Sequence, residues 1–128
     1  MKPNFSVRDL ATVLYNSTDH SCITDHFGGY DYSVMVTPDG NFWNGNRENE
    51  DEAQEFNLSF RFNPDAMWDG IDRERFEKND MDAWEQDRVA YLLLDRADEQ
   101  EDWSNPEFRD CAEKLYDSIC DWLDEQHR

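Results

Sequence analysis

Residues 55–62 read EFNLSFRF, and every second side chain is large and apolar. Such alternation is typical of a strand with one buried face, and residues 30–36, YDYSVMV, share it. Between these stretches, residues 37–40 read TPDG and predict a tight turn, because proline presets φ and glycine accepts the left-handed conformation. We expect residues 41–44 to return as a strand. Residues 30–62 therefore predict a three-stranded antiparallel meander with one apolar face.

Helices are predicted on both sides of this meander. Residues 5–15 carry an apolar stripe at helical spacing, and Ser6 and Asp9 form a pattern like a capping box. Residues 71–78 predict a short helix and residues 82–98 a longer one. The run VAYLLL at residues 89–94 is apolar all round, so we expect it to lie deep in the fold.

The last helix is the most clearly marked element. Ser104 or Asn105 can cap it, and Pro106 suits its first turn. Its apolar residues share one face; they are Phe108, Cys111, Ala112, Leu115, Ile119, Trp122 and Leu123. The whole pattern predicts a single globular domain over residues 1–128, of the α+β class. It consists of an N-terminal helix, the three-stranded antiparallel meander, and two to three helices packed on the sheet.

The charge of the chain limits its partners. It has 31 acidic and 12 basic residues, which gives a formal net charge of −19. A field of this sign repels nucleic-acid phosphates and anionic membrane surfaces, so we expect neither as a direct partner. It attracts basic protein surfaces. Aromatic residues make up 14% of the chain, which excludes a disordered acidic tail, because such tails lack aromatics.

The last helix carries its charge in an ordered pattern. Five acids lie within an arc of ~80° opposite the apolar face. They are Asp110, Glu113, Asp117, Asp121 and Asp124. Like charges four residues apart, and anions near a helix C-terminus, lower helix stability, so the pattern indicates a functional demand. The stripe holds about one charge per 5 Å, against one per ~3.4 Å in a DNA strand, so neighbouring acids are needed to imitate DNA.

Two further acidic segments are candidates for the same surface. One precedes the last helix, and the other lies in a polar loop at residues 45–52, which we expect to be exposed. The candidate residues are Asp95, Asp98, Glu99, Glu101, Asp102, Glu48, Glu50, Asp51 and Glu52. Trp103 stands among the acids of the first segment, where an exposed aromatic side chain can act as a binding hot spot. The other four tryptophans are interpreted mainly as core anchors.

The chain is small and extremely acidic, with interleaved aromatic residues and helices rich in acids, such as residues 110–125. In these respects it resembles the DNA-mimic inhibitors of phages and plasmids, the antirestriction and anti-CRISPR proteins. The resemblance implies a non-enzymatic inhibitor that blocks the nucleic-acid-binding cleft of a bacterial defence complex. Its partner would be an Arg/Lys-rich surface of a nucleic-acid-binding protein or nuclease complex.

Two other interpretations stay open. An immunity protein or antitoxin that neutralises a basic toxin would show tyrosine and tryptophan anchors among its acids. A soluble protein from a saline environment would be acidic on every face.

The sequence offers little for catalysis or metal binding. His20, Cys22, Asp25 and His26 are zinc-ligand types, but their spacing matches no zinc finger or ribbon, so we interpret the segment as a turn. We predict no catalytic residue, no metal and no cofactor. Three cysteines give no disulfide framework, and no apolar run approaches the length of a membrane span, which favours the cytoplasm.

Overall fold

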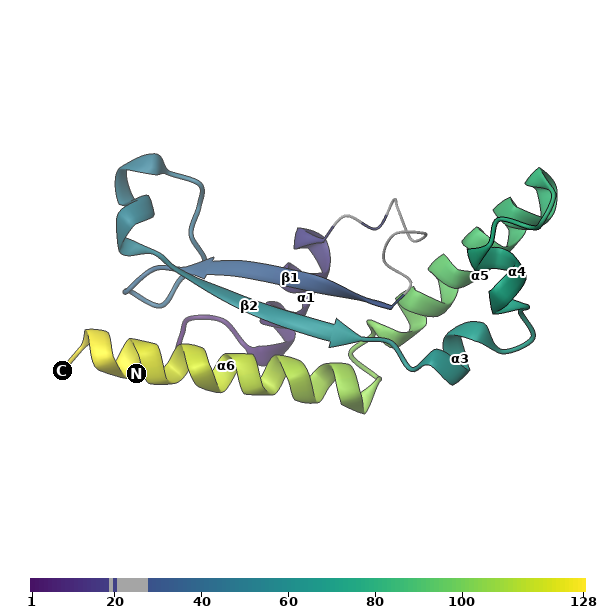
Figure 1. Ribbon diagram of the computed structural model, residues 1–128. Helices are drawn as coiled ribbons and strands as arrows, with labels where there is room; N and C mark the ends of the chain where they lie inside the picture. The colour runs from purple at the N-terminus through teal and green to yellow at the C-terminus, as the bar shows by residue number, and fades with distance from the viewer. Residues whose placement is uncertain (19, 21–27) are drawn as a thin grey trace.

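The computed structural model describes residues 1–18, 20 and 28–128, and it combines helices with one small sheet (Figure 1). In chain order its elements are α1 (Val7–Ser17), β1 (Gly29–Val36), the 3₁₀ helix η1 (Arg47–Glu52), β2 (Gln54–Arg61), α3 (Pro64–Trp68), α4 (Arg73–Glu77), α5 (Ala83–Gln100) and α6 (Pro106–Gln126). The predicted α+β class is confirmed.

The sheet of the described residues has two strands. β1 and β2 are antiparallel and pair along their whole length, from Gly29 opposite Arg61 to Val36 opposite Gln54. Residues 41–44 form only one bridge, between Phe42 and Val36. The predicted three-stranded meander is therefore wrong. The segment expected to be its third strand is instead the direct neighbour of β1.

The chain leaves the sheet after Trp43 for a local reason. The backbone N–H of Trp43 donates to the carbonyl of Met35, but its indole Nε1 donates to the carbonyl of Asn46 at 2.9 Å and to Oδ1 of Asn49 at 3.0 Å. Gly45 adopts a φ of +86°, a conformation that favours glycine. These contacts bend the chain into η1, and such local bonds compete with strand pairing.

Helices α1 and α6 pack on the sheet. α1 contacts β1 and α6, and α6 contacts β2. The alternating residues of the strands point into the core as predicted, with Tyr30, Tyr32, Val34, Val36 and Phe60 all buried. Phe108 of α6 meets the ring of Phe60 at a centroid distance of 5.1 Å and an interplanar angle of 82°. Edge-to-face pairs of this kind add to the free energy gained from burial.

The predicted helix starts are confirmed at both ends of the chain. Ser6 and Asp9 form a reciprocal capping box at the start of α1, because each side chain accepts from the backbone N–H of the other. Asn105 caps α6, and Pro106 occupies its first turn.

Helix α5 extends away from the sheet and packs against α3 (Figure 1). Val89, Leu93 and Ala97 lie on its buried side, whereas Tyr91 is 71% exposed and Leu92 is 38% exposed. The prediction that residues 89–94 lie deep in the fold is therefore wrong. A projecting helix is covered along one side only, so an apolar run cannot be buried all round.

The core contact of β2 with α6 gives a test of this fold. Phe60 is buried and Phe56, on the same face of the same strand, is half-buried. We expect Phe60→Ala to lower the free energy of unfolding by about 3–5 kcal/mol, because it removes a fully packed ring. Phe56→Ala should cost clearly less. Urea denaturation followed by circular dichroism measures both, and equal losses would contradict the packing described.

Candidate functional site

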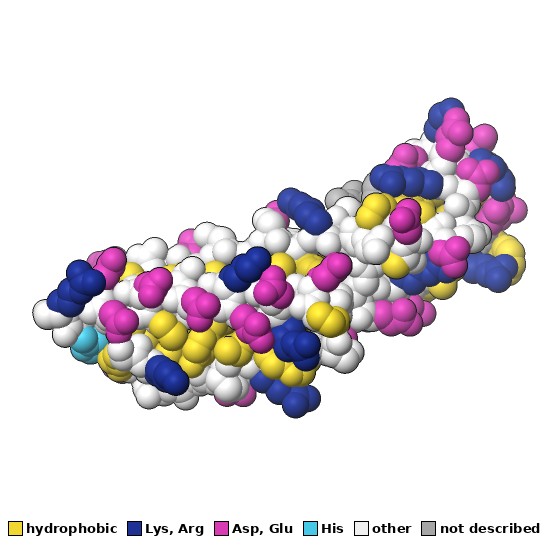
Figure 2. Space-filling model, turned by 90° about the horizontal axis from the view of Figure 1, so that it is seen from below, with side chains coloured by type: hydrophobic (Ala, Val, Ile, Leu, Met, Phe, Trp, Pro, Cys, Tyr) yellow, Lys and Arg dark blue, Asp and Glu magenta, His cyan; other side chains and the backbone are white. Residues whose placement is uncertain are grey.

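The five acids predicted on the last helix form an exposed row along α6, which we call the α6 stripe. Its residues are Asp110, Glu113, Asp117, Asp121 and Asp124, and all five are exposed. Figure 2 shows acidic side chains in a row along this helix. The opposite side of α6 holds buried residues, among them Ala112, Leu115 and Ile119. Packing of that side against the sheet fixes the direction in which the stripe faces.

The two ends of the α6 stripe are paired with cations. Lys114 Nζ lies 3.0 Å from a carboxylate oxygen of Asp110, and the N-terminal ammonium of Met1 pairs with Asp124. The hydrogen bond and charge of that ammonium lower the pKa of Asp124. The three acids between the ends have no ion pair with any residue that the structure describes; they are Glu113, Asp117 and Asp121. The middle of the stripe is therefore uncompensated negative charge.

Acids and bases pair closely in and beside α4. In and beside α4, Arg73 lies 2.8 Å from Glu77, Lys78 lies 2.6 Å from Glu74, and Arg75 reaches Glu85 of α5 at 3.2 Å. The far end of the molecule accordingly shows mixed basic and acidic side chains in Figure 2. Three of the ion pairs thus lie in and beside α4.

The second predicted acidic segment is exposed but lies elsewhere. Glu48, Glu50, Asp51 and Glu52 are all exposed on η1. In Figure 1, η1 lies above the strands and α6 runs beneath them. The helices that carry the η1 acids and the α6 stripe therefore lie on different sides of the sheet.

The acidic segment predicted just before the last helix, at residues 95–102, is partly exposed and partly buried. Asp95, Asp98 and Glu99 of α5 and Asp102 in the following turn are exposed. Glu101 at the C-cap of α5 is buried, with its side chain fully shielded from solvent. The sequence predicted that Glu101 contributes to a partner-binding surface. Its burial shows that it cannot present a charge there.

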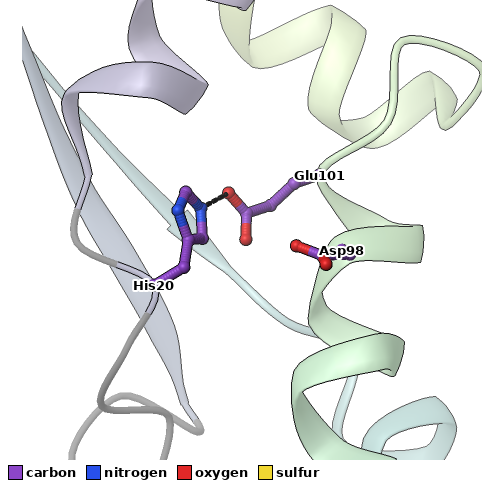
Figure 3. A group of neighbouring side chains, drawn as sticks. All are labelled: His20, Asp98 and Glu101. Atoms are coloured by element: carbon purple, nitrogen blue, oxygen red, sulfur yellow. Dashed lines mark hydrogen bonds and ion pairs between the residues drawn. The ribbon is translucent and has the colours of Figure 1, made fainter.

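Glu101 instead meets residues from the other end of the chain. His20 Nε2 lies 2.9 Å from Glu101 Oε2. Asp98 lies one turn earlier on α5, beside Glu101 (Figure 3), and accepts a 2.9 Å hydrogen bond from the hydroxyl of Tyr15. The His20 ring stacks on Tyr15 at a centroid distance of 4.4 Å and meets Tyr30 edge-on at 5.1 Å. We call His20, Asp98 and Glu101 the carboxylate–histidine cluster.

Burial shifts the pKa values of Glu101 and of two tyrosines near it. It raises the pKa of Glu101, and the interactions of Glu101 with His20 and with the Tyr32 hydroxyl oppose that rise. Burial also raises the pKa of Tyr32, and the nearby Glu101 carboxylate raises it further. Burial and the hydrogen bond to Asp98 raise the pKa of Tyr15 to about 12. Both tyrosines therefore keep their protons at neutral pH.

A cleft of about 330 Å³ adjoins the carboxylate–histidine cluster. Its lining includes Arg8, Tyr15, Asp98, Glu101, Asp102 and Trp103. Trp103 is half-buried, and the Arg109 guanidinium lies 5.9 Å from the centre of its ring. The tryptophan predicted as an exposed hot spot therefore forms part of a cleft wall.

Two features of the structure that are candidates for a functional role were missed by sequence reasoning. Trp84 and Tyr91 on α5 are each 71% exposed, and the Arg88 guanidinium lies 5.6 Å from the centre of the Trp84 ring. The interpretation of Trp84 as a core anchor is wrong; its separation of seven residues from Tyr91, two helical turns, was the available signal. The pairing of His20 with Glu101 joins residues 81 positions apart and had no local signal. Cys22, Asp25 and His26, from the predicted turn, lie outside the described residues.

Comparison with known proteins gives no relationship, because no protein-family model, curated protein or solved structure matches the chain. None of the helices in the described part of the chain has the length and apolarity needed to cross a membrane.

The uncompensated charge of α6 gives a stability test. Asp121 stands four residues from Asp117 and three from Asp124. We expect Asp121→Lys to raise the free energy of unfolding by about 0.5 kcal/mol at low salt, because repulsion becomes attraction. The gain should disappear in 1 M NaCl, which screens exposed charges.

The control is Asp110→Asn, which removes the partner of Lys114 and should leave stability unchanged or slightly lower. Urea denaturation at both salt concentrations measures these effects. Destabilisation by Asp121→Lys at low salt would show that this acid is favourable where it stands.

Proposed function

We propose that the chain is a non-enzymatic inhibitor that acts as a DNA mimic. It would block the nucleic-acid-binding cleft of a bacterial defence complex, of the kind targeted by anti-CRISPR or antirestriction proteins. The observation that carries the proposal is the uncompensated middle of the α6 stripe. Glu113, Asp117 and Asp121 are exposed, stand in one row on the same helix and lack ion pairs among the described residues.

The unpaired acids lower the stability of α6 but would strengthen binding to a basic partner. Three like charges, each four residues from the next, repel one another on the helix surface. The cations of a basic cleft would attract the three acids, offset the repulsion among them and speed association at low salt. The helix backbone holds these carboxylates in place, so little order is lost on binding.

The geometry narrows the proposed contact surface. The η1 acids lie on another side of the sheet, so they do not supply the neighbouring acids that the sequence analysis required, and the proposal places the contact on the α6 stripe. A single stripe has a lower charge density than a DNA strand. The proposed mimicry is therefore of a short run of phosphates bound by a narrow row of arginine and lysine side chains, and not of a whole duplex.

A competition experiment tests this function. Fluorescent DNA is bound to a Cas effector or restriction enzyme, and displacement by the chain is followed by anisotropy. We expect displacement that weakens as salt rises. The double substitution Asp117→Lys with Asp121→Lys should weaken competition at least about tenfold, which corresponds to about 1.4 kcal/mol, and should reduce its salt dependence.

The matched control is Asp69→Lys with Asp80→Lys, which changes the net charge equally at two exposed positions outside α6. Equal loss with both double variants would mean that total charge, not the α6 stripe, determines binding. Failure to displace DNA from every complex tested would contradict mimicry.

A second candidate function is supported by the exposed face of α5. Trp84, Arg88 and Tyr91 belong to the residue types most enriched at binding hot spots, and Trp84 and Tyr91 are largely exposed. Exposed acids flank them, including Asp87 and Asp95. This mixture of aromatic anchors and acids suits an immunity protein or antitoxin that neutralises a basic toxin.

The two candidates separate in a binding experiment with a co-encoded basic toxin, measured by calorimetry. If the chain is an immunity protein, Trp84→Ala and Tyr91→Ala should each weaken toxin binding by about 2 kcal/mol or more. The thermal midpoint should hardly change, because both side chains are exposed. The Asp117→Lys, Asp121→Lys variant serves as the control and should bind nearly as well. The opposite ranking would favour the α6 stripe.

A further inference from the structure

We propose that His20, Asp98 and Glu101 form a binding site for a divalent transition-metal ion of the zinc class. One donor atom from each side chain can be chosen so that all three lie within 4.8 Å of one another. The residues come from two places, the segment after α1 and the C-terminal end of α5. In Figure 3 the His20 ring and the carboxylates of Asp98 and Glu101 converge on a common space.

An orphaned buried oxygen is the second observation. Glu101 Oε1 is shielded from solvent and has no hydrogen-bond partner among the described residues. The Tyr32 hydroxyl is buried close enough to affect the pKa of Glu101, but it too completes no hydrogen bond of normal geometry among the described residues. A buried polar atom without a partner costs about 1–3 kcal/mol, and more when it is charged. A cation coordinated by this oxygen would remove that cost.

The donor set identifies the class of metal. One imidazole nitrogen and two carboxylate oxygens suit zinc and neighbouring first-row ions, whereas calcium and magnesium prefer oxygen ligands alone. Two carboxylates and a neutral imidazole would also balance a charge of +2. Three protein ligands would leave further coordination positions for water or a small ligand from the adjoining cleft, which Asp98 and Glu101 both line.

The surroundings allow the small movement that coordination needs. In a tetrahedral zinc site, ligand atoms lie about 3.3–3.6 Å apart, given metal–ligand distances of ~2.0–2.2 Å. His20 and Glu101 are already 2.9 Å apart, so they need to separate slightly, and Asp98 needs to approach. Asp98 is exposed and can change rotamer, and the Tyr15 hydroxyl is placed to orient its carboxylate, as partners of metal ligands commonly do.

This site is independent of the α6 stripe and of the function proposed for it. It involves no residue of α6, and Glu101 is withdrawn from the surface. Metal binding there would tie the C-terminal end of α5 to the segment that joins α1 to β1.

Zinc titration of the full chain tests the proposal. The protein is first treated with a chelator, then titrated with Zn²⁺ by calorimetry, with Mg²⁺ as a comparison. We expect one Zn²⁺ per chain and no saturable Mg²⁺ binding. Asp98→Asn, Glu101→Gln and His20→Gln should each weaken zinc binding at least about tenfold, because each removes a ligand. Co²⁺ should give the intense visible absorption of a low-coordinate site.

Asp95→Asn and Glu99→Gln are the matched controls, since both neutralise exposed acids of α5 that are neither proposed ligands nor part of the cleft lining. They should bind zinc as the unaltered chain does. If Glu101→Gln fails to fold, the zinc affinity of Asp98→Asn tests the proposal instead. Asp98 is exposed, so this variant should fold, and far-UV circular dichroism can confirm that it does. The proposal is overturned if the chain binds no zinc, or if Asp98→Asn binds it as tightly as the controls.

Discussion

The packing of α6 against β2 determines the orientation of most features that bear on function. Phe108 places its ring against Phe60 of β2 and lies close to Tyr32 of β1, at a centroid distance of 6.1 Å. A helix that buries one side in this way has no freedom to rotate about its axis, because rotation would expose its apolar residues. The α6 stripe faces outward for that reason. The same packing brings the start of α6, and with it the turn that follows Glu101, up to the end of the sheet.

The like charges of the α6 stripe lower the stability of the helix, and only the two ends of the stripe are neutralised by cations. The N-terminal ammonium and Lys114 neutralise the two ends of the stripe, but its middle has no counter-charge among the described residues. Arginines and lysines are present in the chain, yet several of them pair with acids in and near α4 and α5. A protein that is acidic only to stay soluble has no need to hold its unpaired acids in one row. The ordering of these unpaired acids along one helix is what supports the proposed binding role of the stripe.

Local signals predicted the fold well where a few neighbouring residues decide it. The capping box of Ser6 and Asp9, the Asn105 cap and the alternation of both strands depend on short-range geometry, and all are present. The expected middle strand failed because side-chain bonds from Trp43 turn the chain into η1. The buried position expected for residues 89–94 failed because burial depends on which elements cover a helix. Periodicity shows an apolar run but not the number of its neighbours.

The candidate sites, like the fold, were predictable where local sequence decides them and not where distant elements do. The α6 stripe could be derived from helical spacing alone, since both of its faces belong to one element. Glu101 appeared equivalent to Asp98, Glu99 and Asp102 in sequence, and only the fold separates it from them. The C-cap of α5 points this side chain inward, toward His20 and Tyr32, where burial raises its pKa and leaves one oxygen without a hydrogen-bond partner among the described residues. A leucine at this position would avoid the cost of burying a carboxylate, so a buried carboxylate beside a histidine is what supports the proposed metal site.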